Sequence, residues 1–195
     1  MEIISNFASK QSTMTFDRIT EDGKLWAVRY DGKEDNVLFT LFDQWNDVAW
    51  LHRFFKENIQ DLQAYNKNIS INEAIRETIH ESEEMEKLLT EISTADNLSW
   101  LFCPLENFST SDMQSGKEEM RLKRTNHHSS WLRVYAIKPA EGVYIITGGA
   151  IKLAHGMNER KHTQKELENL ENVHDFLLRE NIIGGNGFIE HVNTI

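Results

Sequence analysis

The feature that most constrains the fold is an apolar stretch in the C-terminal third of the chain, residues 131–154. It begins with Trp131-Leu-Arg-Val-Tyr-Ala-Ile-Lys138, continues with Pro-Ala-Glu-Gly, and resumes with Val143-Tyr-Ile-Ile-Thr147. β-Branched and aromatic residues favour strands, and proline at the second position of a turn favours a reversal between them. A glycine pair at 148–149 then precedes a third apolar run, and glycines within a strand commonly mark a bulge or a break. The pattern predicts a meander of three strands, the third over residues 150–154.

Turn signals and hydrophobic periodicity place most of the remaining elements. Asp22-Gly23 separates two β-prone runs, residues 14–20 and 25–30, which is typical of a β-hairpin. Apolar residues then recur every three or four positions over residues 41–58 and 70–92. This spacing places them on one face of a helix, so two packed helices are expected.

Two capping boxes mark helix starts, Ser70 with Glu73 and Thr163 with Glu166. The second box predicts a final helix that ends near Asn181. The segment over about residues 93–130 shows neither the alternation of a strand nor the three- to four-residue spacing of a helix. We expect a long loop or an insertion there. The 195 residues are thus expected to form a single α+β domain, 1–195. Its antiparallel sheet would combine the N-terminal β-hairpin and the three-strand meander, with a helical hairpin and a C-terminal helix.

Composition excludes several classes of protein and site. No apolar run approaches the roughly 20 residues that a membrane-spanning helix needs, so a cytoplasmic protein with no membrane partner is expected. The single cysteine, Cys103, excludes an intramolecular disulfide and a cysteine-cluster metal site. Adjacent histidines such as His127-His128 point in different directions and have no further ligand at metal-binding spacing. We therefore expect neither a metal nor another cofactor.

The charge of the chain is divided unevenly. There are 21 basic and 31 acidic side chains, a net charge of −10, which argues against a general nucleic-acid binder, and no DNA partner is expected. Residues 117–166 nevertheless hold 10 basic and 5 acidic side chains, whereas residues 1–116 hold 10 and 21. Any surface that meets a phosphate backbone should come from residues 117–166. The alternative is that this block only neutralises the acidic half.

Several motifs of this block occur together in one known family. A strand that opens with Leu132-Arg-Val-Tyr135 is followed by one that ends in Gly149-Ala-Ile-Lys152, then by a basic loop and the helix start at Thr163. Over about residues 131–180, the chain resembles the phage-derived Gp49-like/HigB branch of the RelE toxin superfamily. Members of that family have a strand, two helices, three or four strands and a helix in sequence, but they are usually shorter and basic.

The resemblance implies a toxin of a toxin–antitoxin pair that cleaves mRNA on the ribosome without a metal and is held by a small antitoxin protein. Attack of a 2′-hydroxyl on the adjacent phosphate needs a proton acceptor and cations that stabilise the phosphorane. By this resemblance the catalytic candidates are Arg133 and Lys152 on the sheet, Arg160 from the loop, and His155 for proton transfer, with Tyr135 behind it. The RNA-binding candidates are Lys123, Arg124, Lys138, Lys161 and His162.

The same residues also fit a non-catalytic interaction module on the same fold. Arg133 would then form an ion pair with an acidic residue of the N-terminal half, while Lys138 and Lys152 would be solvated lysines that protect a strand edge. The acidic helix over residues 70–92 and the long loop would bind a protein. A related hypothesis has this acidic helix cover the basic face as a mimic of nucleic acid or antitoxin.

Overall fold

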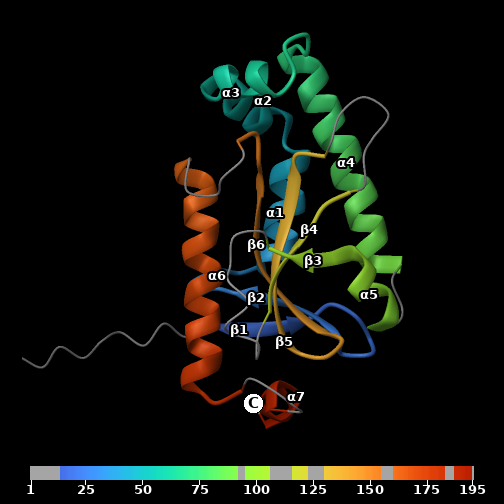
Figure 1. Cartoon of the computed structure of the whole chain (residues 1–195), viewed down its shortest axis with the longest axis vertical. Coiled ribbons are helices and arrows are strands. Elements are labelled where there is room, and N and C mark those ends of the chain that lie inside the picture. The colour runs from blue at the N-terminus through green and yellow to red at the C-terminus, as the bar shows by residue number, and fades with distance from the viewer. Residues whose placement is uncertain are drawn as a thin grey trace, which may run out of the picture.

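The fold is built on one six-stranded sheet with helices on both faces (Figure 1). The computed structural model describes residues 14–91, 95–105, 116–122, 130–154, 160–182 and 187–194. The strands are β1 (Thr15–Arg18), β2 (Leu25–Arg29), β3 (Phe102–Pro104), β4 (Gly116–Met120), β5 (Leu132–Ala140) and β6 (Val143–Ile151). Their order is β1-β2-β6-β5-β4-β3, and only β2 and β6 run parallel. The α+β class expected from the sequence is confirmed.

The predicted hairpin and meander are present with changed limits. β1 and β2 pair antiparallel, and Gly23 in their turn has φ of +69°, which glycine adopts without strain. β6 continues through the glycine pair to Ile151, so the predicted third strand over 150–154 is not separate. The pairing shifts register between Tyr135 and Ala136, where Thr147 is the extra residue of β6. This irregularity agrees with the bulge predicted at the glycines.

Strands that the sequence does not reveal complete the sheet. β3 and β4 lie in the segment expected to be a loop, and α5 (Ala95–Leu101) precedes them. β4 reads Gly-Lys-Glu-Glu-Met and shows no apolar alternation, yet it pairs with β5 along its whole length. The meander therefore has four described strands, β3 to β6, rather than three.

The helices form two layers. α1 (Val37–Asn46), α2 (Val48–Glu57) and α4 (Ile71–Glu91) cover one face of the sheet, and α6 (Lys161–Arg179) lies on the other (Figure 1). The shorter α3 (Ile59–Tyr65) and α7 (Gly187–Thr194) lie near opposite ends of the molecule. In the part of the chain that the structure describes, no helix has the length and apolarity that crossing a bilayer requires.

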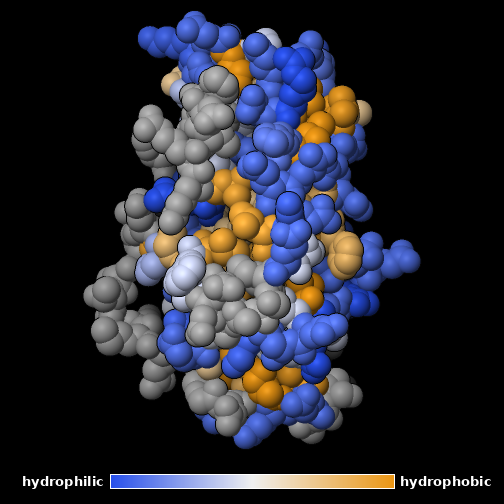
Figure 2. All heavy atoms as spheres, turned by 90° about the vertical axis from the view of Figure 1, so that its right-hand side faces the viewer, coloured by the Kyte–Doolittle hydropathy of each residue, from blue (hydrophilic) through white to orange (hydrophobic). Residues whose placement is uncertain are grey.

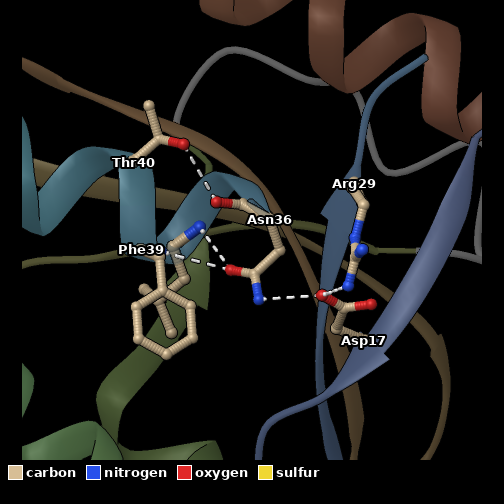
Figure 3. A network of polar contacts seen from close by, with 6 residues as sticks. Asp17, Arg29, Asn36, Phe39 and Thr40 are labelled. Atoms are coloured by element: carbon tan, nitrogen blue, oxygen red, sulfur yellow. Dashed lines mark hydrogen bonds and ion pairs between the residues drawn. The ribbon is translucent and has the colours of Figure 1, made fainter. Parts of the chain in front are cut away.

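The single helix expected over residues 41–58 is two helices, because both α1 and α2 have their own N-caps. The Asp47 carboxylate accepts hydrogen bonds from the N–H groups of Ala49 and Trp50 and starts α2. Asn36 starts α1, and its side-chain amide also donates to the Asp17 carboxylate at 3.1 Å. The same carboxylate forms an ion pair with Arg29 (Figure 3). This network fixes the N-terminus of α1 to the β1–β2 hairpin.

The two predicted capping boxes have different outcomes. At the start of α4, the Ser70 N–H donates to the Glu73 carboxylate and the Glu73 N–H donates to the Ser70 hydroxyl, as predicted. The second box is wrong, because α6 already begins at Lys161 and Thr163 lies inside the helix. The Thr163 hydroxyl donates to the Arg160 carbonyl, and Glu166 is directed to the sheet.

Candidate functional site

Arg133 and Tyr135 lie on the face of the sheet that α6 covers. Leu132 and Val134 belong to the core formed with α1 and α4, while Tyr135 belongs to the core formed with α6. Because successive side chains of a strand alternate between faces, Arg133 shares the α6 face with Tyr135, as the sequence predicts. The candidate site is therefore the α6 face around these two residues.

The Arg133 side chain is buried and held in one position. Its Nη1 donates to the backbone carbonyls of Ser130 and Leu132 at 2.7 and 2.8 Å. Its Nε lies 3.8 Å from Oε1 of Glu119, a residue of β4 that is also buried. Neither Nε of Arg133 nor Oε2 of Glu119 has a hydrogen bond. A buried ion pair whose hydrogen-bonding capacity is not filled costs stability, which makes this pair a candidate for a functional role.

Tyr135 carries a further polar atom that is buried without a partner. The residue is fully buried, and its hydroxyl has no hydrogen bond. Burial raises the pKa of this phenol, with further contributions from the charges of Glu119 and Glu166, while Arg133 opposes the rise. The Tyr30 hydroxyl, in contrast, donates to the Thr147 carbonyl at 2.6 Å. Tyr135 is thus within electrostatic reach of Glu119, Arg133 and Glu166.

Glu166 brings a carboxyl group from α6 to the same face. Its Oε2 lies so close to Gly148 that a Cβ atom there would collide with it. The carboxylate accepts a hydrogen bond from the Gly149 N–H and has Asn169 Nδ2 at 3.4 Å. Burial is the main cause that raises the pKa of Glu166 to about 7. We call Glu119, Arg133, Tyr135 and Glu166 the sheet cluster.

A second group of predicted residues gathers where β6 ends and α6 begins. His162 has its Nε2 3.0 Å from the Ile151 carbonyl and its ring edge-on to Phe54, with centroids 5.2 Å apart. Burial lowers the pKa of this imidazole. Lys152 directly follows β6, and its N–H donates to the Trp131 carbonyl. Exposed Lys161 is the first residue of α6.

Arg160, the catalytic candidate directly before α6, is paired with a carboxylate. Its Nε and Nη2 each lie 2.5 Å from an oxygen of Asp61 in α3. The hydrogen bond from Arg160 is the main cause that lowers the pKa of Asp61. This two-point contact joins α3 to the start of α6.

Two other expected relationships differ from the structure. Ala150, not Lys152, is paired with Arg133 across the two strands. Lys138 lies at the far end of β5, about 16 Å from Arg133 at the usual strand rise, and its Nζ is 2.9 Å from Oε2 of Glu141. His155, Lys123 and Arg124 lie outside the described residues. The structure thus brings together Lys152, Lys161 and His162 near Arg160, but not Lys138.

The acidic helix α4 does not cover Arg133. α4 packs with α1 and α2 on the face of the sheet opposite to α6 and Arg133. Exposed Glu83, Glu84 and Glu86 point away from this core, and the side of the molecule that carries α4 and α5 is mostly hydrophilic (Figure 2). The hypothesis that this helix mimics a nucleic acid over Arg133 is therefore wrong.

Sequence reasoning does not identify Glu119, Glu166 or Asp61 as site residues. Glu119 lies in a charged segment without strand periodicity, and Asp61 gives no motif. The glycine pair is the one usable signal for Glu166, because glycine within a strand indicates close approach by another group.

Chemically, the sheet cluster provides one cation, two carboxyl groups and a phenol on one face, a set suited to binding an anion and transferring a proton. Among the described residues, no three His, Cys, Asp or Glu side chains are grouped as metal ligands. Comparison of the chain with protein-family models, curated proteins and solved structures finds no match.

Proposed function

We propose that this chain is a RelE/HigB-like toxin of a toxin–antitoxin pair, which cleaves mRNA on the ribosome by attack of a 2′-hydroxyl on the adjacent phosphate. The observation that carries the proposal is that Arg133, Tyr135 and Glu166 share one face of the sheet. The family resemblance supports it, as does the sequential order of strands β1 and β2, helices α1 to α5, strands β3 to β6 and helices α6 and α7, which has the family's alternation of strands, helices, strands and helix with additional elements. A small antitoxin is the proposed partner.

In this proposal, Arg133 stabilises the phosphorane, since a guanidinium binds phosphate oxygens in a fixed geometry. The carbonyls of Ser130 and Leu132 already orient it, so little conformational entropy is lost when a phosphate binds. Lys152 and Lys161 would contact the RNA backbone at the end of β6. His155 remains the proposed proton-transfer residue of the loop.

A second candidate function is the non-catalytic interaction module. It is favoured by the pairing of three predicted cations: Arg160 with Asp61, Lys138 with Glu141, and Arg133 with buried Glu119. Cations that are already neutralised within the fold are less available to RNA. In this case the Arg133–Glu119 pair would serve only the specificity of the fold.

Controlled expression in bacteria distinguishes the two functions. We expect the wild-type chain to arrest growth and to produce cleaved transcripts in a translating extract. Arg133→Lys retains the charge but loses the planar fork, so toxicity and cleavage should fall by at least about tenfold. Arg179→Lys, at the exposed C-terminal end of α6, is the matched control and should remain toxic. A harmless wild-type protein that cleaves no transcript, or a fully active Arg133→Lys variant, contradicts the endonuclease proposal.

A further inference from the structure

An aromatic surface lies beside exposed cations where α2 meets the start of α6. We propose that Trp50, Arg53 and Lys161 form a binding surface for single-stranded RNA, with a base stacked on the indole and phosphates on the two cations. This inference names the residues that hold the substrate strand, and it rests on the proposed function for the choice of RNA as the ligand. Its evidence is the packing of the aromatic rings, the local charge and the exposure of the side chains.

Three aromatic rings join α2 to the start of α6. Trp50 and Phe54, about one helical turn apart, are stacked, with ring centroids 5.2 Å apart and an interplanar angle of 17°. Phe54 is buried and meets the His162 ring edge-on. Both helices reach the same end of the molecule, the upper end in Figure 1. Phe54 thus forms the base of the surface, and Trp50, which is only partly buried, carries an aromatic ring to its outside.

Cations outnumber acidic groups at this end, although the net charge of the chain is −10. α2, α3 and the described residues within 152–165 hold six lysines and arginines against two acidic residues. One of these two, Asp61, is paired with Arg160. Arg53 and Lys161 are exposed, and within the described ranges neither of them takes part in an ion pair. Their charges are therefore available to phosphate groups.

The spacing along α2 places Arg53 next to the indole. Side chains three and four positions apart are neighbours on a helix, so Arg53 lies beside Trp50. Exposed Glu57 is the acidic side chain of the same flank and would oppose an RNA strand. Exposed Lys56 lies about 120° around the helix from Trp50, outside the proposed surface.

A partly exposed indole beside cations suits a single strand better than a duplex. An unpaired base has a free face that stacks on an aromatic ring whatever its sequence, while the cations contact the backbone. In a double-stranded RNA the bases already stack on one another, and proteins contact mainly the phosphates and the 2′-hydroxyls. Trp50 therefore contributes to the binding of a single strand and not to that of a duplex.

The test is the affinity of the full chain for a fluorescein-labelled single-stranded RNA of about 12 nucleotides, measured by fluorescence anisotropy at several salt concentrations. Trp50→Leu removes the ring and should weaken binding by about tenfold, whereas Trp50→Phe should keep most of the affinity. Arg53→Gln should weaken binding and reduce the slope of log K against log salt by about 0.7, the value for one phosphate contact on a single strand. Lys56→Gln is the matched control and should bind as the wild type does.

The outcomes separate the inference from the proposed function. The inference is wrong if the wild type binds no RNA, if Trp50→Leu binds as the wild type does, or if Trp50→Leu weakens duplex binding equally. Each of these results leaves the endonuclease proposal to its own cleavage assay. If the wild type binds the strand through Trp50 and Arg53 but cleaves no transcript, the inference stands and the endonuclease proposal is wrong.

Thermal unfolding shows whether Trp50→Leu is folded, since the indole also packs against the core. If it is not, Arg53→Gln decides, because this side chain is exposed and its loss leaves the core intact. An Arg53→Gln variant with the affinity and salt slope of the wild type contradicts the binding surface.

Discussion

Gly148 of β6 and Glu166 of α6 are so close that no side chain fits between them. This contact joins the last long helix to the strand next to Arg133, and it places a carboxyl group on the buried side of the helix. The two residues are separated by the whole connection between β6 and α6, so the contact is a product of the tertiary structure.

The first prediction concerns this contact. Gly148→Ala should destabilise the protein by about 1–3 kcal/mol, because the new methyl group displaces the Glu166 carboxyl and shifts α6. Glu166→Ala in the same chain should restore most of this loss, since it removes the colliding atoms. Urea unfolding of the two single variants and the double variant measures the coupling.

Gly149→Ala is the control for this cycle. Its Cβ would lie 2.6 Å from the Arg133 carbonyl oxygen and 2.8 Å from Leu41 Cδ1, on the α1 face. Although the Gly149 N–H donates to Glu166, these collisions do not involve Glu166, so removing the Glu166 side chain should restore little of this loss. A Gly148→Ala loss that Glu166→Ala restores no better contradicts the contact.

The second prediction is the pH dependence of stability that Glu166 causes. Its pKa rises from 4.5 in the unfolded chain to about 7 in the fold. Between these values the native state binds the proton and the unfolded state does not, so the free energy of unfolding falls as pH rises. The fall should be at most about 3 kcal/mol between pH 4.5 and 7.

His162 acts in the opposite direction over part of this range. Burial lowers the pKa of its imidazole, so its contribution to stability is present above the unfolded pKa of 6.5 and is lost as pH falls through the lower folded value. The measurement is therefore the difference between wild type and Glu166→Gln in urea unfolding at several pH values. A difference that is constant from pH 4.5 to 7 contradicts the raised pKa.

The third prediction compares two buried phenols. The Tyr135 hydroxyl has no hydrogen bond, so Tyr135→Phe should leave stability unchanged or raise it by about 1 kcal/mol. Tyr30→Phe removes the bond to the Thr147 carbonyl and should lower stability by about 1 kcal/mol. Thermal unfolding of both variants at one pH is the measurement. Equal losses in the two variants would show that the Tyr135 hydroxyl is bonded in solution.

The same two variants separate an effect on the cleavage rate from an effect on stability. A buried polar atom without a partner is retained at a cost, and such groups are frequent at functional sites. If Tyr135 assists Arg133 in the proposed cleavage, Tyr135→Phe lowers the cleavage rate without lowering stability, whereas Tyr30→Phe does the reverse.

The face of the sheet that carries Arg133 and Tyr135 follows from sequence, because strand alternation needs only local information. The position of the Glu166 carboxyl on the same face does not follow from the sequence. Thr-Gln-Lys-Glu fits a capping box, but the box forms only if the helix begins at Thr163, and α6 begins at Lys161. Glu119 is similarly hidden, since a glutamate in a charged run gives no strand signal. It is buried, and its ion-pair partner Arg133 reaches it from the neighbouring strand.

The fourth prediction concerns Arg160 and Asp61, whose contact bears on both candidate functions. Asp61→Asn should lower stability by about 1 kcal/mol, because it weakens a two-point ion pair that is only partly shielded from water. Arg160→Gln should cost at least as much, and the double variant should cost little more than Arg160→Gln alone. The stabilisation is present above the unfolded pKa of Asp61, 3.8, and is lost as pH falls through the lower folded value.

RNA affinity then shows whether this pair is only structural. If Arg160 binds RNA, Asp61→Asn removes a carboxylate that competes with phosphate for the guanidinium, and a single-stranded RNA should bind more tightly, with a stronger dependence on salt. If Arg160 only joins α3 to α6, affinity is unchanged while stability falls. Tighter binding by Asp61→Asn that Arg160→Gln abolishes would favour the toxin, because a cation held by a nearby carboxylate would then be available to the substrate. Unchanged affinity in both variants would assign the contact to the fold alone.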